Sequence, residues 1–279
     1  MDLHRITHPL RLAKGSHQRG SGKGCAMNVI SYITGDALIT DFPACSARPL
    51  ALLVQSCNDQ LAEPGGYLSP ENSVLALELA WQTVGTADTS DTVTHGWLAE
   101  LLTNPTWGVV QYAKITAVKA IYDIAELHRK AASGDMPPIA AWDAAERAAR
   151  AAAQAMNPAS NVAGTNALKA AYQSAALADT RHDQATLEAV TASALHAHAQ
   201  ATATTSARRM VQLTRQAIRS WRYLAGLDNP GDRPTSIQQG RQPGHSGFQD
   251  RVCSAAPTGR HKTNPKTMAT NRTTRRSSR

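Results

Sequence analysis

The spacing of apolar and polar positions predicts helices along most of the chain. Apolar residues in one segment recur at i, i+3, i+4, i+7 and i+11, which is one stripe of a helix: Leu50, Leu53, Val54, Cys57 and Leu61. The residues Ser69-Pro70-Glu71 have the types expected at a helix start, namely a capping hydroxyl, a proline and an acid. In the helix that follows, the predicted buried face carries Val74, Leu77, Trp81 and Val84.

Similar patterns predict further helices near residues 25–35, 97–102, 107–130, 140–156, 163–178 and 183–226. One side of the helix at 107–130 carries Val110, Ala117, Ile121, Ile124 and His128. Residues 1–24 are polar and rich in glycine, so we expect an irregular lead-in. The predicted fold class is therefore an all-α, multi-helix bundle with a long C-terminal helix.

Composition divides the chain into three predicted regions. Residues 1–135 are expected to form a helical domain that carries the motifs described below, and residues 136–227 an alanine-rich helical hairpin or bundle. Alanine favours helix but buries little surface per residue, so a close helix contact is expected there, with an oligomerising coil as the alternative. Residues 228–279 have too few apolar side chains to offset the entropy of ordering, which predicts a disordered basic tail.

The net charge of +8 belongs mainly to the C-terminal end of the chain. Residues 228–279 contribute +7, from ten Lys/Arg and three Asp/Glu, and the rest of the chain contributes +1. This distribution does not favour binding of nucleic acid by the whole fold. Residues 189–227 carry five arginines and no acid, so an anionic partner is expected to contact the chain beyond residue 200.

Arginines of the last predicted helix fall on one face, at i, i+7, i+11 and i+14: Arg208, Arg215, Arg219 and Arg222. Together with Arg275 and Arg276 of the tail, they could follow the phosphates of a nucleic acid. Few aromatic residues lie among them to stack on bases. The alternatives are an anionic protein partner, ion pairs with acids on neighbouring helices, or simple solvation.

A cluster of cysteine and histidine residues marks the N-terminal part of the chain. His17, Cys25 and Cys45 have the chemistry of zinc ligands, with Cys57 as a fourth candidate. Their wide spacing differs from the close ligand pairs of zinc modules, and Cys57 also fits a buried core position. A second hypothesis makes Cys25 a nucleophile at a helix N-terminus with His17 as its base.

Other classes of site are not indicated. Residues 20–24 lack the glycine and the Ser/Thr that a phosphate-binding loop requires. His196 and His198 point to different sides of a helix, which predicts a solvated face rather than a metal site. No long apolar run and no signal peptide occur, so we expect a cytoplasmic protein without a membrane partner and without disulfides.

The N-terminal motifs resemble those of a group of uncharacterised proteins from actinobacteria and their phages. The resemblance rests on Gly15-Ser16-His17, Gly24-Cys25-Ala26-Met27, Asp41-Phe42-Pro43-Ala44-Cys45 and Asn58-Asp59, and more loosely on the alanine-rich region up to about residue 155. Members usually have glutamate at the position of Asn28 and a histidine–serine pair at Ile39-Thr40. The resemblance implies a cytoplasmic, phage-related protein and no particular activity.

The leading functional hypothesis is a helical protein that acts through contacts with other proteins, with no catalytic activity evident and no cofactor. One alternative is a nucleic-acid-associated protein that uses the arginines of residues 208–222 and the tail. The other is a metal- or thiol-dependent enzyme at His17, Cys25 and Cys45, for which zinc would be the metal.

Overall fold

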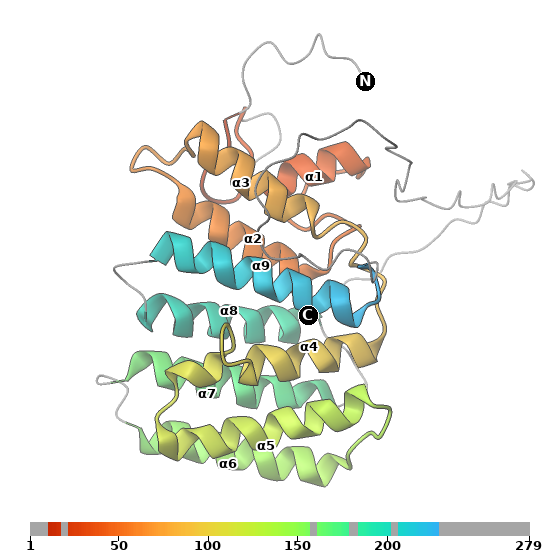
Figure 1. Ribbon diagram of the computed structural model, residues 1–279, viewed down its shortest axis with the longest axis vertical. Helices are drawn as coiled ribbons and strands as arrows, with labels where there is room; N and C mark the ends of the chain where they lie inside the picture. The colour runs from red at the N-terminus through yellow and green to blue at the C-terminus, as the bar shows by residue number, and fades with distance from the viewer. Residues whose placement is uncertain (1–10, 18–21, 157–160, 179–183, 202–205, 229–279) are drawn as a thin grey trace, which may run out of the picture. The chain divides into compact units, whose positions relative to one another are not determined.

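The computed structural model describes residues 11–17, 22–156, 161–178, 184–201 and 206–228. Within these ranges the chain forms nine α-helices and two short 3₁₀ helices, and its β pairing is limited to isolated bridges. The helices are α1 (Ala26–Thr34), α2 (Arg48–Leu61), α3 (Pro70–Trp81), α4 (Asp91–Thr103), α5 (Ile115–Ala132), α6 (Ile139–Ala155), α7 (Val162–Ala175), α8 (Gln184–Ala201) and α9 (Ser206–Leu224), with η2 (Val109–Tyr112) and η4 (Ala176–Ala178). The predicted all-α bundle is confirmed (Figure 1).

The ends of several helices follow from local sequence. Gly35 ends α1 in the left-handed region, at φ 84°, where a residue without a side chain is favoured. Ser69 begins α3, and its hydroxyl accepts a hydrogen bond from the backbone N–H of Asn72. Pro70 occupies the first position of α3, where its missing N–H costs nothing.

The helices pack in a stack that runs from α5 and α6 to α1 and α3 (Figure 1). Helix α7 packs against α6 and α8, and α4 packs against α5 and α9. Helix α2 joins α1 and α3 to the middle of the stack because it contacts α1, α3, α8 and α9. The boundary predicted near residue 135 stays a prediction, and the helices on its two sides pack directly together, α5 against α6.

Tryptophans anchor the core. Trp97 of α4 is fully buried, and its ring lies 6.3 Å from that of Trp107 and 5.4 Å from that of Trp221 on α9, measured between centroids. The indole N–H of Trp97 donates to the carbonyl of Ala217 at 2.9 Å. This bond ties α4 to α9 across a long stretch of sequence.

The predicted buried face of α3 is correct only in part, because Leu77 and Val84 are partly buried against the core whereas Val74 and Trp81 are exposed. Val74 is 68% exposed and Trp81 is 50% exposed, whereas Ala76, Leu79 and Ala80 are buried. Helix α3 carries apolar residues on two faces. The small side chains of the alanine face allow close packing against α1 and α2, so that face enters the core.

Other elements differ from prediction in their limits. The single helix expected at 183–226 is two helices, α8 and α9, and both pack against α2. Helix α4 begins several residues before the predicted 97–102 helix, and the segment 107–130 divides into η2 and α5. The predicted tail at 228–279 lies outside the described residues, apart from residue 228.

Candidate functional site

The N-terminal motif residues form a hydrogen-bonded network that holds the lead-in segment against α1 and α2. The amide of Asn58 donates to the carbonyl of Ala13 at 3.0 Å, and its oxygen accepts from the N–H of Ala26 at 3.3 Å. Asp59 accepts from the N–H of Gly15 at 2.9 Å. The Asn58-Asp59 pair therefore joins three separate parts of the chain.

A second part of the network surrounds the start of α1. The oxygen of Asn28 accepts from the N–H of Cys25 at 2.9 Å, and the amide of Asn28 donates to Asp41 Oδ1 at 2.8 Å. The thiol of Cys25 donates to the same carboxylate oxygen at 3.5 Å. These contacts give the motif a structural role, because they bind the loop that carries Asp41 to the start of α1.

The structure does not assemble the predicted zinc site. The Nε2–H of His17 donates to the carbonyl of Ala13 at 3.1 Å, while Cys45 Sγ contacts the hydroxyls of Thr34 and Ser46, each at 3.7 Å. Among the described residues, no three His, Cys, Asp or Glu side chains gather as metal ligands. Each of these groups is held instead by a different local partner.

The surroundings of Cys25 do not favour the predicted thiol nucleophile. Cys25 does begin α1, but its side chain is buried, and burial raises the pKa of its thiol to about 12. The nearby negative charge of Asp41 adds to this rise in pKa, and backbone hydrogen bonds at Asn28 and Met27 only partly oppose it. A buried, protonated thiol beside a carboxylate is not an activated nucleophile.

The arginines of α9 fall into two groups. Arg215 lies 3.7 Å from the carboxylate of Glu78 on α3, and Arg222 lies 2.8 Å from Asp228 and donates to the carbonyl of Gln82. The Arg215–Glu78 contact is an ion pair with a neighbouring helix, as one alternative from the sequence expected, whereas Asp228 follows α9 itself. Arg208 and Arg219 are exposed and have no ion-pair partner among the residues that the structure describes, whereas Arg275 and Arg276 lie outside them.

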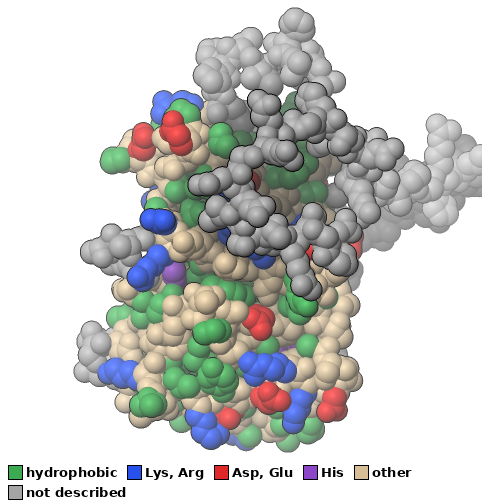
Figure 2. All heavy atoms as spheres, in the orientation of Figure 1, with side chains coloured by type: hydrophobic (Ala, Val, Ile, Leu, Met, Phe, Trp, Pro, Cys, Tyr) green, Lys and Arg blue, Asp and Glu red, His purple; other side chains and the backbone are tan. Residues whose placement is uncertain are grey.

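Figure 2 shows where charges gather on one face. Lys and Arg side chains lie beside the start of α9, while both signs of charge are mixed over α5 and α6. The outward face of α9 carries arginine, glutamine and tyrosine and no acid. The exposed side of this helix is therefore positively charged.

A buried polar cluster joins α4, α5 and α7, and sequence spacing did not reveal it. The Nδ1 atoms of His95 and His128 are 2.9 Å apart, and His128 Nε2 lies 3.0 Å from the Ser174 hydroxyl. The ring of Trp142 packs edge-on against His128, with centroids 4.8 Å apart. Serine and histidine in this arrangement suggest catalysis, but burial of all three makes the cluster part of the core.

An exposed apolar surface on α3 is the feature that sequence reasoning assigned to the core. It consists of the exposed Val74 and Trp81 together with Leu77, which is partly buried, and we call it the α3 surface. The contacts of Arg215 with Glu78 and of Arg222 with Gln82 place the positive face of α9 along one side of it. An apolar strip with an arginine border is typical of a protein–protein contact site.

No protein-family model, curated protein or solved structure matches the chain. The resemblance to actinobacterial and phage proteins therefore stays a prediction. No helix in the described ranges combines the length and the apolar composition needed to cross a bilayer.

Proposed function

We propose that the protein acts by binding a partner protein at the α3 surface, and that the partner contributes a segment with apolar and acidic side chains. The observation that carries this proposal is the exposure of Trp81 and Val74, 50% and 68%, on a helix whose other face is packed. Trp and Arg are the residue types most enriched among energetically dominant interface residues.

The charge around the α3 surface supports an acidic partner. The Arg215–Glu78 pair is long and partly exposed, so it contributes at most about 1 kcal/mol. Carboxylates of a partner can therefore compete with Glu78 for Arg215. They can also pair with Arg219, which is exposed on the same helix. Apolar side chains of the same partner segment would cover Val74 and Trp81.

The proposal can be tested with a synthetic amphipathic helical peptide that carries leucines on one face and glutamates on the other. Its binding to the full-length protein is measured by fluorescence anisotropy, against a matched peptide with lysines in place of the glutamates. We expect a dissociation constant of about 1–10 µM for the acidic peptide only. Trp81→Ala is expected to weaken binding by about tenfold or more, as for an interface hot spot.

Tyr122→Ala is the matched control, because Tyr122 is an aromatic residue of α5 with 43% exposure, away from the α3 surface. This variant should bind as the wild type does. Equal binding of both peptides, or an equal loss in the two variants, would contradict the proposal. A dimer that Trp81→Ala dissociates would reassign the α3 surface to a second copy of the chain.

A second candidate function, association with nucleic acid, is supported by the exposure of Arg208 and Arg219 on a helix face without acids. We expect a mobility shift of a mixed-sequence DNA duplex that weakens between about 50 and 200 mM salt. In the double variant Arg208→Gln/Arg219→Gln, the slope of log affinity against log salt should fall by about 2, one phosphate contact for each arginine. An unchanged slope would remove these arginines from the interface.

A further inference from the structure

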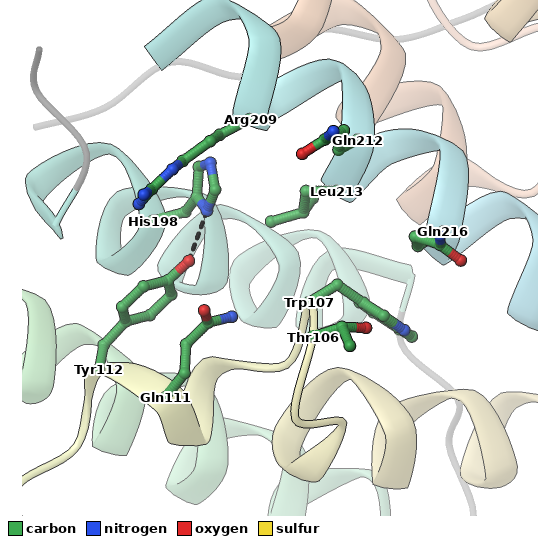
Figure 3. Close-up of a pocket in the computed structure, with 9 residues that line it drawn as sticks. All are labelled: Thr106, Trp107, Gln111, Tyr112, His198, Arg209, Gln212, Leu213 and Gln216. Carbon is green, nitrogen blue, oxygen red and sulfur yellow. Dashed lines mark hydrogen bonds between the residues drawn. The ribbon is translucent and has the colours of Figure 1, made fainter. Parts of the chain in front are cut away.

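A cavity of about 470 Å³ lies between η2, α8 and α9, apart from the α3 surface (Figure 3). The segment before η2 contributes Thr106 and Trp107, α8 contributes His198, and one side of α9 contributes Arg209 and two glutamines. This volume falls within the range of small-molecule sites, which is about 300–1,000 Å³. The cavity is large enough for a small organic molecule.

The wall of the cavity contains a neutral histidine–tyrosine pair. The hydroxyl of Tyr112 and Nδ1 of His198 are 2.6 Å apart, and Figure 3 shows the hydroxyl directed at the imidazole ring. Burial lowers the pKa of His198, and the positive charge of Arg209 lowers it further. Burial also raises the pKa of Tyr112 to about 12. Both side chains are therefore neutral near pH 7. The side chain of His198 is buried, which corrects the solvated face predicted for it.

Arg209 thus carries the positive charge of the site. No carboxylate is present among the residues that line the cavity, and Arg209 has no ion-pair partner in the described part of the chain. Glutamine side chains at 111, 212 and 216 supply amide donors and acceptors around the same space. Trp107 and Leu213 supply apolar wall. The cavity therefore combines one cation, on the exposed side chain of Arg209, with neutral polar groups and an apolar side.

We propose that this cavity binds a small organic monocarboxylate. Its carboxylate pairs with the guanidinium of Arg209, which lies beside His198 in Figure 3, its apolar body extends toward Leu213, and the glutamine amides bind its remaining polar groups. A planar guanidinium matches a carboxylate with two parallel hydrogen bonds. A single arginine balances one negative charge, which favours a carboxylate over a phosphate dianion.

The test uses 4-hydroxybenzoate as the probe, with 4-hydroxybenzamide as its neutral counterpart and inorganic phosphate as the competing anion. Binding to the full-length protein is followed through the ¹H–¹⁵N signals of the Trp107 indole and of the Gln212 and Gln216 amides. We expect the carboxylate to shift these signals with a dissociation constant of about 1 mM, as suits a ligand of this size. The amide should bind at least tenfold more weakly, roughly the worth of one charged hydrogen bond.

Arg209→Gln should weaken binding of 4-hydroxybenzoate by about tenfold or more. Arg208→Gln is the matched control, because Arg208 is the neighbouring exposed arginine, does not line the cavity, and changes the net charge equally. Wild-type binding in Arg208→Gln with loss in Arg209→Gln supports the proposal. An equal loss in both variants, tighter binding of phosphate at the same signals, or no shift with the carboxylate would overturn it.

Discussion

His95 on α4 and His128 on α5 share a hydrogen bond between their Nδ1 atoms, at 2.9 Å, and both rings are buried in the core. The Ser174 hydroxyl donates to the carbonyl of Ala171 at 2.7 Å, so it accepts from His128 Nε2–H. His128 Nδ1 is then an acceptor, and His95 Nδ1–H is the donor. The bond thus requires a neutral His128, and it joins three helices through one line of donors and acceptors.

This arrangement predicts that acid destabilises the fold through His128. Burial, with the nearby His95 as a second cause, lowers the pKa of His128 well below its ordinary value. The unfolded chain therefore takes up a proton first as pH falls, and stability that is complete above about pH 6.5 declines below it. Urea unfolding between pH 7.5 and 5 (about half a unit per step) should show a loss that approaches 1.4 kcal/mol per pH unit for this group.

His128→Gln keeps an amide near the Ser174 hydroxyl but does not titrate, so its stability should depend less on pH than that of the wild type. His196→Gln, on the exposed side of α8, should leave the pH dependence unchanged. If the wild type and His128→Gln lose stability in parallel from neutral to mildly acidic pH, the histidine pair is not the cause.

Gly108 precedes η2 and lies against the end of α4. A β-carbon at this position would stand 2.5 Å from the backbone nitrogen of Asn104 and 2.6 Å from its carbonyl oxygen, and neither atom can move without shifting α4. Gly108→Ala should therefore lower the free energy of unfolding by about 1–3 kcal/mol. Gly65→Ala is the control, because a β-carbon there meets no atom within 4 Å, and its stability should differ little from that of the wild type. An unchanged free energy of unfolding in Gly108→Ala would contradict the close packing.

Most of the helices could be predicted from the sequence because their signals are local. The apolar stripe of α2, the capping residues of α3 and the glycine that ends α1 each act within a few residues. His128 shares one side of its helix with Ile121 and Ile124 in the sequence pattern, and all three side chains are buried in the structure. Periodicity identifies a helix and its apolar face whenever there is only one such face.

The sites could not be predicted because they depend on contacts between distant residues. His95 and Ser174 lie 33 and 46 residues from His128, and Tyr112 lies 86 residues from His198. Helix α3 shows a different limit, since both of its faces are apolar and periodicity alone does not say which of them enters the core. Trp81 is exposed because the other face of α3 packs against α1 and α2.

The burial of Cys25 predicts a slow reaction with Ellman's reagent in the native protein. Its pKa of about 12 leaves almost no thiolate at neutral pH, and Cys57, whose pKa burial also raises to about 12, should behave alike. The measurement uses a Cys253→Ser background, so that the thiols counted are those of the three buried residues Cys25, Cys45 and Cys57. In urea, all three thiols should react with Ellman's reagent at the rate of an ordinary cysteine. Fast labelling of Cys25 in native protein, identified by mass spectrometry, would restore the nucleophile hypothesis.

Trp97 and Trp81 allow a direct comparison between a tryptophan that stabilises the fold and one that we propose to contact a partner protein. Trp97→Phe removes the donor to the Ala217 carbonyl and leaves a gap beside Trp107 and Trp221, so it should cost about 2–4 kcal/mol of unfolding free energy. Trp81→Phe, at a half-exposed position, should cost less than about 1 kcal/mol. Urea unfolding followed by circular dichroism measures both. A large loss in Trp81→Phe would show that this residue supports the fold, and the α3 surface would then lose its main argument as a binding site.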